Sequence, residues 1–332
     1  MTAQDTFLAR AGWADAERTA LAGDASARAY QRLTKQTASA ILMIDPTGDT
    51  GLFQSLAEYL VAHGLSAPRI LAADTQNGLL LLEDLGDALF ARLAIEQPSL
   101  EPVLYRTAAE VLAKLHRLPP PADLPRATPV MLAQATDLAF DWYAARAGHD
   151  VPQAAKTEAM DALLAALEAH AGAPSVTMLR DFHAENLLWL PDREGSARAG
   201  LLDFQDAMLG HAPYDLVSLL QDARRDVPQR IAKDTTAHFL TLTGHDPDQF
   251  SAAAATLGAQ RNLRILGVFT RLCISAGKSH YIDLIPRVWA HLQDNLRHPA
   301  LADLAEKLLP LLPSPEISTL ERLKSQCPTR KP

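Results

Sequence analysis

A short β-rich segment, residues 176–204, constrains the fold more than any other part of the sequence. It contains the strand-like runs VTML, LLWL and AGLLDF, separated by the loop RDFHAEN and the turn PDREG. A turn built from Asp, Arg, Glu and Gly permits the last two strands to pair as a hairpin. We therefore expect the strand ends that carry Asn186 and Asp203 to lie side by side.

Polar side chains crowd the loop of this segment and the end of its last strand. Asp181 and Asn186 are five residues apart, and Asp203 follows 17 residues after Asn186. Two oxygen donors on neighbouring strands suit a magnesium ion, which takes one or two protein carboxylates together with substrate phosphates. A third carboxylate, held off the metal, could accept a proton from a hydroxyl group. The segment thus predicts a metal site beside a general base.

The first 85 residues are predicted to form two hairpins around one helix. RAYQRLTK and ASAILMI read as paired strands, and Asn77-Gly78, between PRILAAD and LLLLEDLG, is a strong hairpin signal. From Thr50 onward, apolar residues recur at helical spacing, and Gly64 stands where a C-terminal cap belongs.

Beyond residue 85 the spacing of apolar residues is mainly helical. We expect helices over 102–118 and 153–171, and three or four more from Ala254 onward. The expected fold is α+β, with a small lobe built on an antiparallel sheet, residues 1–85, and a mainly helical lobe, residues 86–332.

The composition favours a globular protein that binds small molecules. With 39 acidic and 31 basic residues, the net charge of −8 argues against nucleic acid or an anionic membrane as partner. The sequence shows no export signal and no long uncharged apolar run, so we expect a cytoplasmic protein. We also expect a monomer. Cys273 and Cys327 are the two cysteines, and without a CxxC motif they predict neither a disulfide framework nor a structural zinc site.

Three further features are interpreted as structural. SAGKSH resembles a phosphate-binding P-loop, but Leu272 stands where the first glycine of that motif is required. His183 and Glu185 form H-x-E without the P-C-x-x-C segment that completes a zinc deaminase site. Asp215 begins the apolar run YDLVSLL, where we interpret it as a favourable charge at a helix N-terminus rather than a catalytic group.

D-x-x-x-x-N, followed by a strand, a turn and LLDF, resembles the catalytic and metal-binding loops of kinase-like phosphotransferases. The likeness is to the aminoglycoside phosphotransferase and choline kinase superfamily, and it covers nearly the whole chain. Within it the chain looks like the anomeric sugar kinases of bacterial cell-wall recycling, which phosphorylate the 1-hydroxyl of N-acetylmuramate and N-acetylglucosamine. Five stretches carry this likeness: GDASARAY, LLLEDLGD, RDFHAENLLWL, GLLDFQDAMLGHAPYDLVSLLQDARRDV and QRNLRILGVFTRL.

The resemblance implies a two-lobed protein-kinase-like fold and roles for particular residues. Asp181 would be the catalytic base, with Asn186 and Asp203 as Mg²⁺ ligands, because phosphoryl transfer from ATP needs positioning and charge neutralisation. The phosphate-covering loop would be Gly23, Asp24, Ala25, Ser26 and Ala27, and the adenine-reading hinge would be Glu83, Asp84 and Leu85.

One departure from the kinase pattern concerns a lysine. Kinases place a lysine on the third strand to hold the nucleotide phosphates, but AILMIDP contains none. Arg28 or Arg32 on the adjacent strand is the alternative source of this charge, and Glu58 would then lack its usual partner.

Other polar residues of these stretches are candidates for loop positioning and acceptor binding. His183 would orient Asp181 or rigidify the loop through a backbone carbonyl, and we favour the structural role. Arginine suits a carboxylate because its planar fork binds both oxygens. Candidates to contact sugar hydroxyls or a lactyl carboxylate, or only to solvate a helix end, are Gln205, Asp206, Asp222, Arg224 and Arg225.

Two other functions remain open on the sequence. An aminoglycoside or other small-alcohol O-phosphotransferase of the same fold would be favoured by an acidic pocket without a usable arginine. A nucleotide-binding pseudokinase is permitted by the missing strand lysine, although the presence of a base and both metal ligands argues against it.

Overall fold

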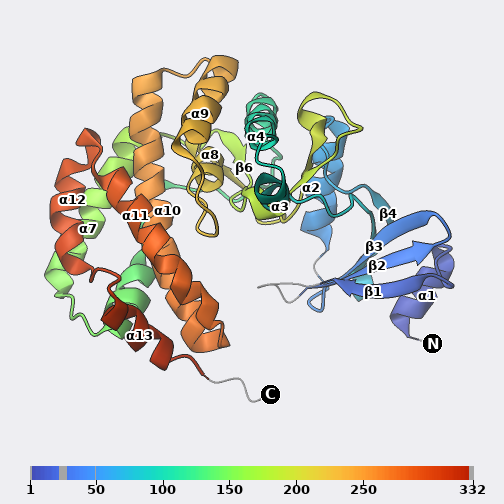
Figure 1. Ribbon diagram of the computed structural model, residues 1–332, viewed down its shortest axis with the longest axis horizontal. Helices are drawn as coiled ribbons and strands as arrows, with labels where there is room; N and C mark the ends of the chain where they lie inside the picture. The colour runs from blue at the N-terminus through green and yellow to red at the C-terminus, as the bar shows by residue number, and fades with distance from the viewer. Residues whose placement is uncertain (1, 22–27, 49, 329–332) are drawn as a thin grey trace. The chain divides into compact units, whose positions relative to one another are not determined.

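The computed structural model describes residues 2–21, 28–48 and 50–328, which form two compact units (Figure 1). Unit 1 comprises the chain up to Lys114 together with Ala184–Asp206. Unit 2 comprises Leu115–His183 and the chain from Ala207 onward. These units divide the chain at different places from the lobes expected from the sequence, 1–85 and 86–332, which stay a prediction.

Unit 1 is built on a five-stranded antiparallel sheet with strand order β1-β2-β3-β5-β4. Its strands are β1 (Glu17–Leu21), β2 (Ala29–Lys35), β3 (Ala38–Ile44), β4 (Ile70–Asp74) and β5 (Leu79–Glu83). Both predicted hairpins are confirmed, because β2 pairs with β3 and β4 pairs with β5. Gly78 closes the second hairpin at φ +66°, and a Cβ there would lie 2.1 Å from the carbonyl oxygen of Asp45, so only glycine fits.

Two elements of unit 1 were not expected from the sequence. Strand β1 adds an edge to the sheet, and its mostly exposed ERTAL run has no apolar alternation to announce it. Helix α1 (Ala3–Arg10) begins with a capping box between Thr2 and Asp5, and its Phe7 and Leu8 are buried in a cluster with sheet residues such as Leu33.

Two further helices of unit 1 agree with the prediction, and one short helix between them was not predicted separately. Helix α2 (Gly51–Ala62) follows Thr50, and Gly64 has φ +69° just after its end. Helices α3 (Phe90–Glu96) and α4 (Glu101–Leu115) come next. Phe53 of α2 packs on Phe204 with ring centroids 4.9 Å apart, so α2 supports the chain directly after Asp203.

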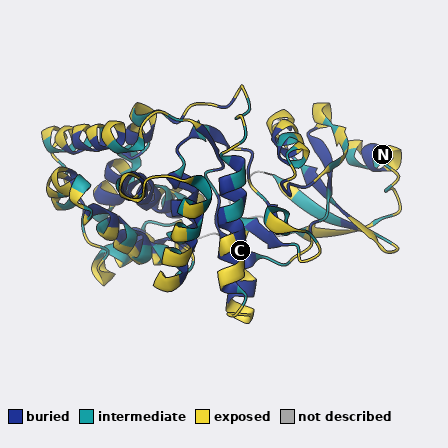
Figure 2. Cartoon of the chain, turned by 90° about the horizontal axis from the view of Figure 1, so that it is seen from above, coloured by how far each residue is buried: buried dark blue, intermediate teal, exposed yellow. Residues whose placement is uncertain are grey.

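Unit 2 is mainly helical, with α10 packed against several of its neighbours (Figure 1). The segments predicted over 153–171 and from Ala254 are confirmed as helical, although α10 begins earlier. In Figure 2 the outward faces of these helices carry the exposed residues. The helices are α5 (Pro129–Gln134), a π-helical turn (Ala139–Ala144), α6 (Ala145–Ala147), α7 (Gln153–Ala166), a second π-helical turn (Leu167–Ala171), α8 (Pro213–Leu220), α9 (Gln229–Thr243), α10 (Pro247–Ala276), α11 (Ile285–Leu296), α12 (Ala302–Leu308) and α13 (Ile317–Ser325).

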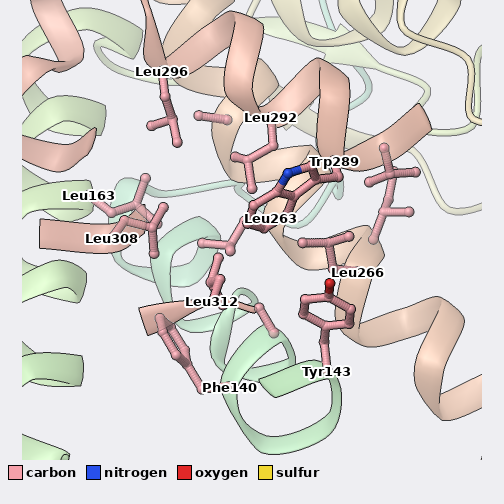
Figure 3. Packing of buried hydrophobic residues seen from close by; sticks show 14 of the residues in the cluster. Phe140, Tyr143, Leu163, Leu263, Leu266, Trp289, Leu292, Leu296, Leu308 and Leu312 are labelled. Carbon is pink, nitrogen blue, oxygen red and sulfur yellow. The ribbon is translucent and has the colours of Figure 1, made fainter. Parts of the chain in front are cut away.

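The core of unit 2 forms where these helices meet α10. Figure 3 shows Leu263 and Leu266 of α10 among Phe140, Tyr143 and Trp289, all of them buried. Removing this much apolar surface from water is the main stabilising contribution to such a unit.

A disulfide in unit 2 contradicts the expectation from the cysteine count. Cys273 of α10 is bonded to Cys327, just after α13, with Cα atoms 5.2 Å apart and a separation of 54 positions in sequence. The prediction of no disulfide was wrong because two cysteines without a motif carry no signal of spatial proximity, which here depends on how α13 packs beside α10.

Candidate active site

The segment Leu179–Asp181 lies at the end of a short strand in unit 2. Strand β6 (Val176–Met178) is present as predicted, and it pairs with β9 (Met208–Gly210), a partner that the sequence did not reveal. Arg180 has φ +71°, a left-handed conformation that is uncommon for residues other than glycine. The backbone just before Asp181 therefore requires stabilising contacts.

Asp215 holds this backbone. Its carboxylate accepts the N–H of Leu179 at 2.6 Å and the N–H of Arg180 at 2.8 Å, one on each oxygen. Burial raises the pKa of Asp215 to about 7, although the two N–H groups lower it and the charge of Asp181 adds to the rise. Asp215 does lie in the first turn of α8, but its main partner is the segment before Asp181.

A second contact to the same backbone comes from α8 and α10. The hydroxyl of Ser218 donates to the carbonyl oxygen of Arg180 at 3.2 Å, and Arg261 donates from Nη2 to the Ser218 oxygen at 2.8 Å. The residue before Asp181 is thus bound at both its N–H and its C=O. Sequence reasoning interpreted Asp215 only as a charge at a helix N-terminus and did not identify Ser218 or Arg261, although a carboxylate inside the apolar run YDLVSLL signals a buried group that needs partners.

His183 is buried and close to positive charge. Burial lowers its pKa to about 3, and Arg224 and Arg261 contribute in the same direction. The imidazole is therefore neutral at physiological pH. The predicted loop-orienting role of His183 stays a prediction.

The predicted metal ligands lie together in unit 1. Strand β7 (Leu187–Trp189) pairs with β8 (Ala199–Leu201), with Leu187 opposite Leu201. The N–H of Leu202 donates to the carbonyl oxygen of Asn186, so the ladder continues to the residue before Asp203. Asn186 Nδ2 lies 3.5 Å from Asp203 Oδ2, and the expectation that these strand ends lie side by side is confirmed.

The chemistry of this pair fits a hard divalent cation. Asp203 offers a carboxylate and Asn186 an amide oxygen, which exchanges places with its nitrogen by a rotation about χ2. Gln205 Nε2 donates to Asp203 Oδ1 at 2.7 Å, the kind of outer contact that orients a ligating carboxylate. Within the described ranges, no group of three or more His, Cys, Asp or Glu side chains could hold a metal by itself. The two oxygen donors of Asp203 and Asn186 fit Mg²⁺ that keeps part of its shell for phosphates.

Arg28 and Arg32, the two candidate replacements for the strand lysine, have different surroundings. Arg28 Nε lies 2.8 Å from Asp45 Oδ2, and although burial lowers the pKa of Arg28, the charges of Asp45 and Asp206 contribute to a net rise. Arg32 instead bonds Asp87 at 2.7 Å and Asp84 at 3.0 Å.

Tyr30 is influenced by both Arg28 and Asp203, one of the predicted metal ligands. Burial raises the pKa of Tyr30, and the negative charge of Asp203 raises it further while Arg28 opposes this. Arg28, Tyr30 and Asp203 therefore share one electrostatic neighbourhood in unit 1. Glu58, the partner of the lysine in the kinase pattern, accepts instead from Gln54 at 2.8 Å.

The hinge candidates are held by ion pairs and packing. Glu83 pairs with Arg69 at 3.1 Å and with Arg193 at 2.8 Å, and its N–H donates to the carbonyl oxygen of Arg69. Leu85 is buried, and its side chain lies against Gly200 of β8. The predicted phosphate-loop residues Gly23, Asp24, Ala25, Ser26 and Ala27 lie outside the described residues.

The predicted site residues divide between the two units. Unit 1 holds Arg28, Arg32, Glu83, Leu85, Asn186, Asp203 and Gln205, whereas unit 2 holds Asp181, His183, Asp222, Arg224 and Arg225.

Two of the acceptor candidates already have clear partners. Gln205 is engaged with Asp203. Asp222 is 1% exposed, and its Oδ1 accepts the N–H of Arg224 at 2.8 Å.

Comparisons with known proteins agree with each other. The model of a family described as "Phosphotransferase enzyme family" matches residues 17–251. An N-acetylmuramate/N-acetylglucosamine kinase of Caulobacter vibrioides is 39% identical, over 91% of this chain and 94% of the relative. A protein of the same name from Pseudomonas aeruginosa is 32% identical, over 92% and 93%.

Solved structures give the fold. A choline kinase from Streptococcus pneumoniae matches 88% of this chain and 99% of its own, with a TM-score of 0.60 at 13% identity. This likeness confirms the expected kinase-like α+β fold, and at such low identity it bears on the fold alone.

Proposed function

This chain belongs to the phosphotransferase enzyme family, and on that premise we propose that it is an ATP-dependent kinase of N-acetylated amino sugars. It transfers the terminal phosphoryl group of ATP to the anomeric 1-hydroxyl of N-acetylmuramate, N-acetylglucosamine or both, as a step of peptidoglycan recycling. The observation that carries this proposal is the 39% identity, over nearly the whole chain, to a relative named for those two sugars.

Asp181 is the proposed general base. Asp215 and Ser218 hydrogen-bond the backbone just before Asp181. The Asp181 carboxylate therefore extends from a backbone whose position is fixed. The oxygen of the sugar 1-hydroxyl attacks the terminal phosphorus of ATP, its proton passes to the Asp181 carboxylate, and ADP leaves. Rigid placement matters because small displacements of a catalytic group cost large factors in rate.

Asn186 and Asp203 are the residues that would hold Mg²⁺. When bound, the ion offsets the negative charge of the phosphates. The support on this chain is the placement of both side chains at one end of the β7–β8 hairpin, with Gln205 fixing the Asp203 carboxylate.

Arg28, rather than Arg32, is the proposed cation for the nucleotide phosphates. Arg28 shares its electrostatic surroundings with Asp203 and Asp206, whereas Arg32 is bound to Asp84 and Asp87 at the hinge. We assign Arg32 to fixing the hinge segment beside adenine, with Glu83 and Leu85 as the hinge residues. Ser26 remains the proposed phosphate-loop residue.

The charge around Asp181 argues against an aminoglycoside as acceptor. Arg224 and Arg261 contribute to lowering the pKa of His183, and Arg264 contributes to lowering that of Arg261, so several cations gather in this part of unit 2. A polycationic acceptor would be repelled there, whereas a neutral or anionic sugar would not. A pseudokinase would bind ATP without turnover, which the assay below detects.

We propose that the enzyme is a cytoplasmic monomer, since ATP and recycled sugars meet in the cytoplasm. Among the described helices, none is long and apolar enough to cross a membrane. The bond between Cys273 and Cys327 weighs against a reducing compartment. Free thiols are counted in protein taken directly from cells under alkylating conditions. Two free thiols would support the cytoplasmic assignment, whereas the absence of free thiols would contradict it.

Phosphorus NMR tests the proposed reaction. The protein is incubated with Mg-ATP and, in separate tubes, N-acetylmuramate, N-acetylglucosamine and an aminoglycoside. We expect a sugar 1-phosphate signal with the first two sugars and none with the third. ADP release without a 1-phosphate signal, or phosphorylation of the aminoglycoside alone, would overturn the proposal.

A further inference from the structure

We propose that Arg261 and Asp222 form the part of the acceptor site that recognises the lactyl group of N-acetylmuramate, with Arg261 binding its carboxylate. This inference rests on the proposed sugar kinase function and refines it. N-acetylmuramate differs from N-acetylglucosamine by a lactyl ether, which adds one negative charge. A residue that reads this charge determines which of the two sugars the enzyme prefers.

The first observation is a buried guanidinium in unit 2, one of whose nitrogen donors has no hydrogen-bond acceptor among the described residues. Arg261 is 7% exposed, and Nη2 donates to Ser218, but Nη1 has no hydrogen-bond partner among the described residues. A guanidinium presents its donors as a planar fork that matches the two oxygens of a carboxylate. One side of that fork is in use, and the other is available.

The second observation is a buried acceptor close enough to influence this cation. Asp222 is 1% exposed, and while Oδ1 accepts the N–H of Arg224, Oδ2 has no hydrogen-bond partner in the described part of the chain. Burial lowers the pKa of Arg261, and Asp222 is among the groups that oppose this decrease. Buried polar atoms almost always have partners, so an unused donor near an unused acceptor points to a ligand that supplies both.

The chemistry of that ligand follows from the two buried atoms that lack hydrogen-bond partners among the described residues. Nη1 of Arg261 needs an acceptor, and a carboxylate also neutralises its buried charge, which is costly to leave uncompensated. Oδ2 of Asp222 needs a donor, which a sugar hydroxyl supplies. An acidic sugar carries both groups, whereas a polyamine acceptor would place cations against Arg261.

The position of Arg261 places this ligand near the reaction. Through Ser218, Arg261 is two hydrogen bonds away from the carbonyl oxygen of Arg180, which directly precedes Asp181. The charge of Asp181 also influences the pKa of Arg261. A sugar bound at Arg261 through its lactyl group is therefore near the proposed base.

A purely positioning role is the competing explanation, because Arg261 also supports Ser218. The two roles separate in the kinetics of the two sugars. Positioning of Asp181 affects both sugars equally, whereas charge recognition affects only N-acetylmuramate. Ser218→Ala is the matched control, since it interrupts the contact to Arg180 and leaves the guanidinium in place.

The experiment measures kcat/KM of Arg261→Gln and Ser218→Ala with both sugars. Because the variant loses a buried charge-assisted contact, we expect Arg261→Gln to lower the value for N-acetylmuramate at least about 30-fold more than for N-acetylglucosamine. Ser218→Ala should lower both by similar factors. Equal losses for both sugars in Arg261→Gln would overturn the inference and leave the kinase function standing.

A substrate-side test covers the case in which Arg261→Gln does not fold. The lactyl carboxamide of N-acetylmuramate keeps the shape of the substrate and removes its charge. We expect the wild-type enzyme to use it at least about 30-fold less well than N-acetylmuramate. Comparable use of the amide would refute the carboxylate contact. If the wild-type protein phosphorylates neither sugar, the proposed function fails, and this inference fails with it.

Discussion

Two short backbone segments carry the proposed chemistry, and they are stabilised in opposite ways. The hairpin ends with Asn186 and Asp203 are placed by strand pairing between β7 and β8, which are neighbours in sequence. The segment before Asp181 is positioned by Asp215 and Ser218 of α8 and by Arg261 of α10, two helices that are distant from it in sequence.

This difference predicts different responses to mutation. Removing a proposed metal ligand at a hairpin end takes away a functional group and leaves the strand pairing in place. Removing Asp215 leaves buried N–H groups without acceptors, which costs stability as well as rate. Mutations at the β7–β8 hairpin ends should therefore reduce activity without reducing stability, whereas loss of Asp215 should reduce both.

The largest effect is expected for Asp181→Asn. Loss of a general base lowers kcat by about 10²–10⁴, while ATP affinity is retained because the change keeps the size of the side chain. Turnover by coupled ADP detection and ATP binding by calorimetry measure this. Glu185→Gln, an exposed carboxylate on the same loop, is the control and should stay near normal. Near-normal turnover of Asp181→Asn would remove Asp181 from the mechanism.

Asp203→Asn should lower kcat/KM by about 100-fold or more and raise the Mg²⁺ concentration needed for half-maximal rate, because a metal ligand contributes several kcal/mol. Its melting temperature should match the wild type. Asp192→Asn, in the turn of the same hairpin, is the control. An unchanged magnesium requirement would contradict the assignment of Asp203.

Asp215→Ala should lower both rate and stability. Two unsatisfied N–H groups cost roughly 1–3 kcal/mol each, enough to reduce the melting temperature by about 5 °C or more. Displacement of Asp181 should reduce kcat by about 10- to 100-fold with little change in KM for ATP. A variant that melts like the wild type would show that Asp215 does not hold this backbone, and the contrast with the hairpin would fail.

Arg28→Gln and Arg32→Gln compare the two candidate phosphate cations. A lost charge-assisted contact to phosphate should raise KM for ATP about tenfold in Arg28→Gln. Arg32 is partly exposed and paired with acidic side chains, so its loss should change KM by less than about fivefold. The reverse order of effects would assign the phosphates to Arg32.

The smallest effect concerns His183 and pH. Its pKa is lowered to about 3 in the folded protein, so below pH 6.5 the unfolded chain binds a proton that the folded one does not. The free energy of unfolding should therefore decrease by about 1 kcal/mol from pH 6.5 to pH 5.5 through this group. Urea unfolding of wild type and His183→Asn at both values measures it. An equal pH dependence in the two proteins would show that His183 is not buried and neutral.

Local patterns explain which parts of the fold could be predicted. The hairpin around Asn77-Gly78, helix α2 and the pairing of β7 with β8 all depend on residues close in sequence. Their turn residues and apolar spacing are visible without a structure. The strands that were not predicted are β1, whose exposed run has no apolar alternation, and β9, whose partner β6 lies well before it in the chain.

The candidate site divides in the same way. The sequence pointed to Asp181, Asn186 and Asp203, because their spacing and the strands around them form a motif. It did not reveal that Asp215 binds the backbone of Leu179 and Arg180, or that Arg261 is buried with a vacant donor.

By itself, the sequence determined the order of hairpins and helices and the residue types available for phosphoryl transfer, since local hydrogen bonding and apolar spacing specify both. Only the tertiary structure decided which charges are buried, which are paired and which keep an unused atom. Burial depends on how α8 and α10 pack, and the energetic cost of a charge depends on its burial.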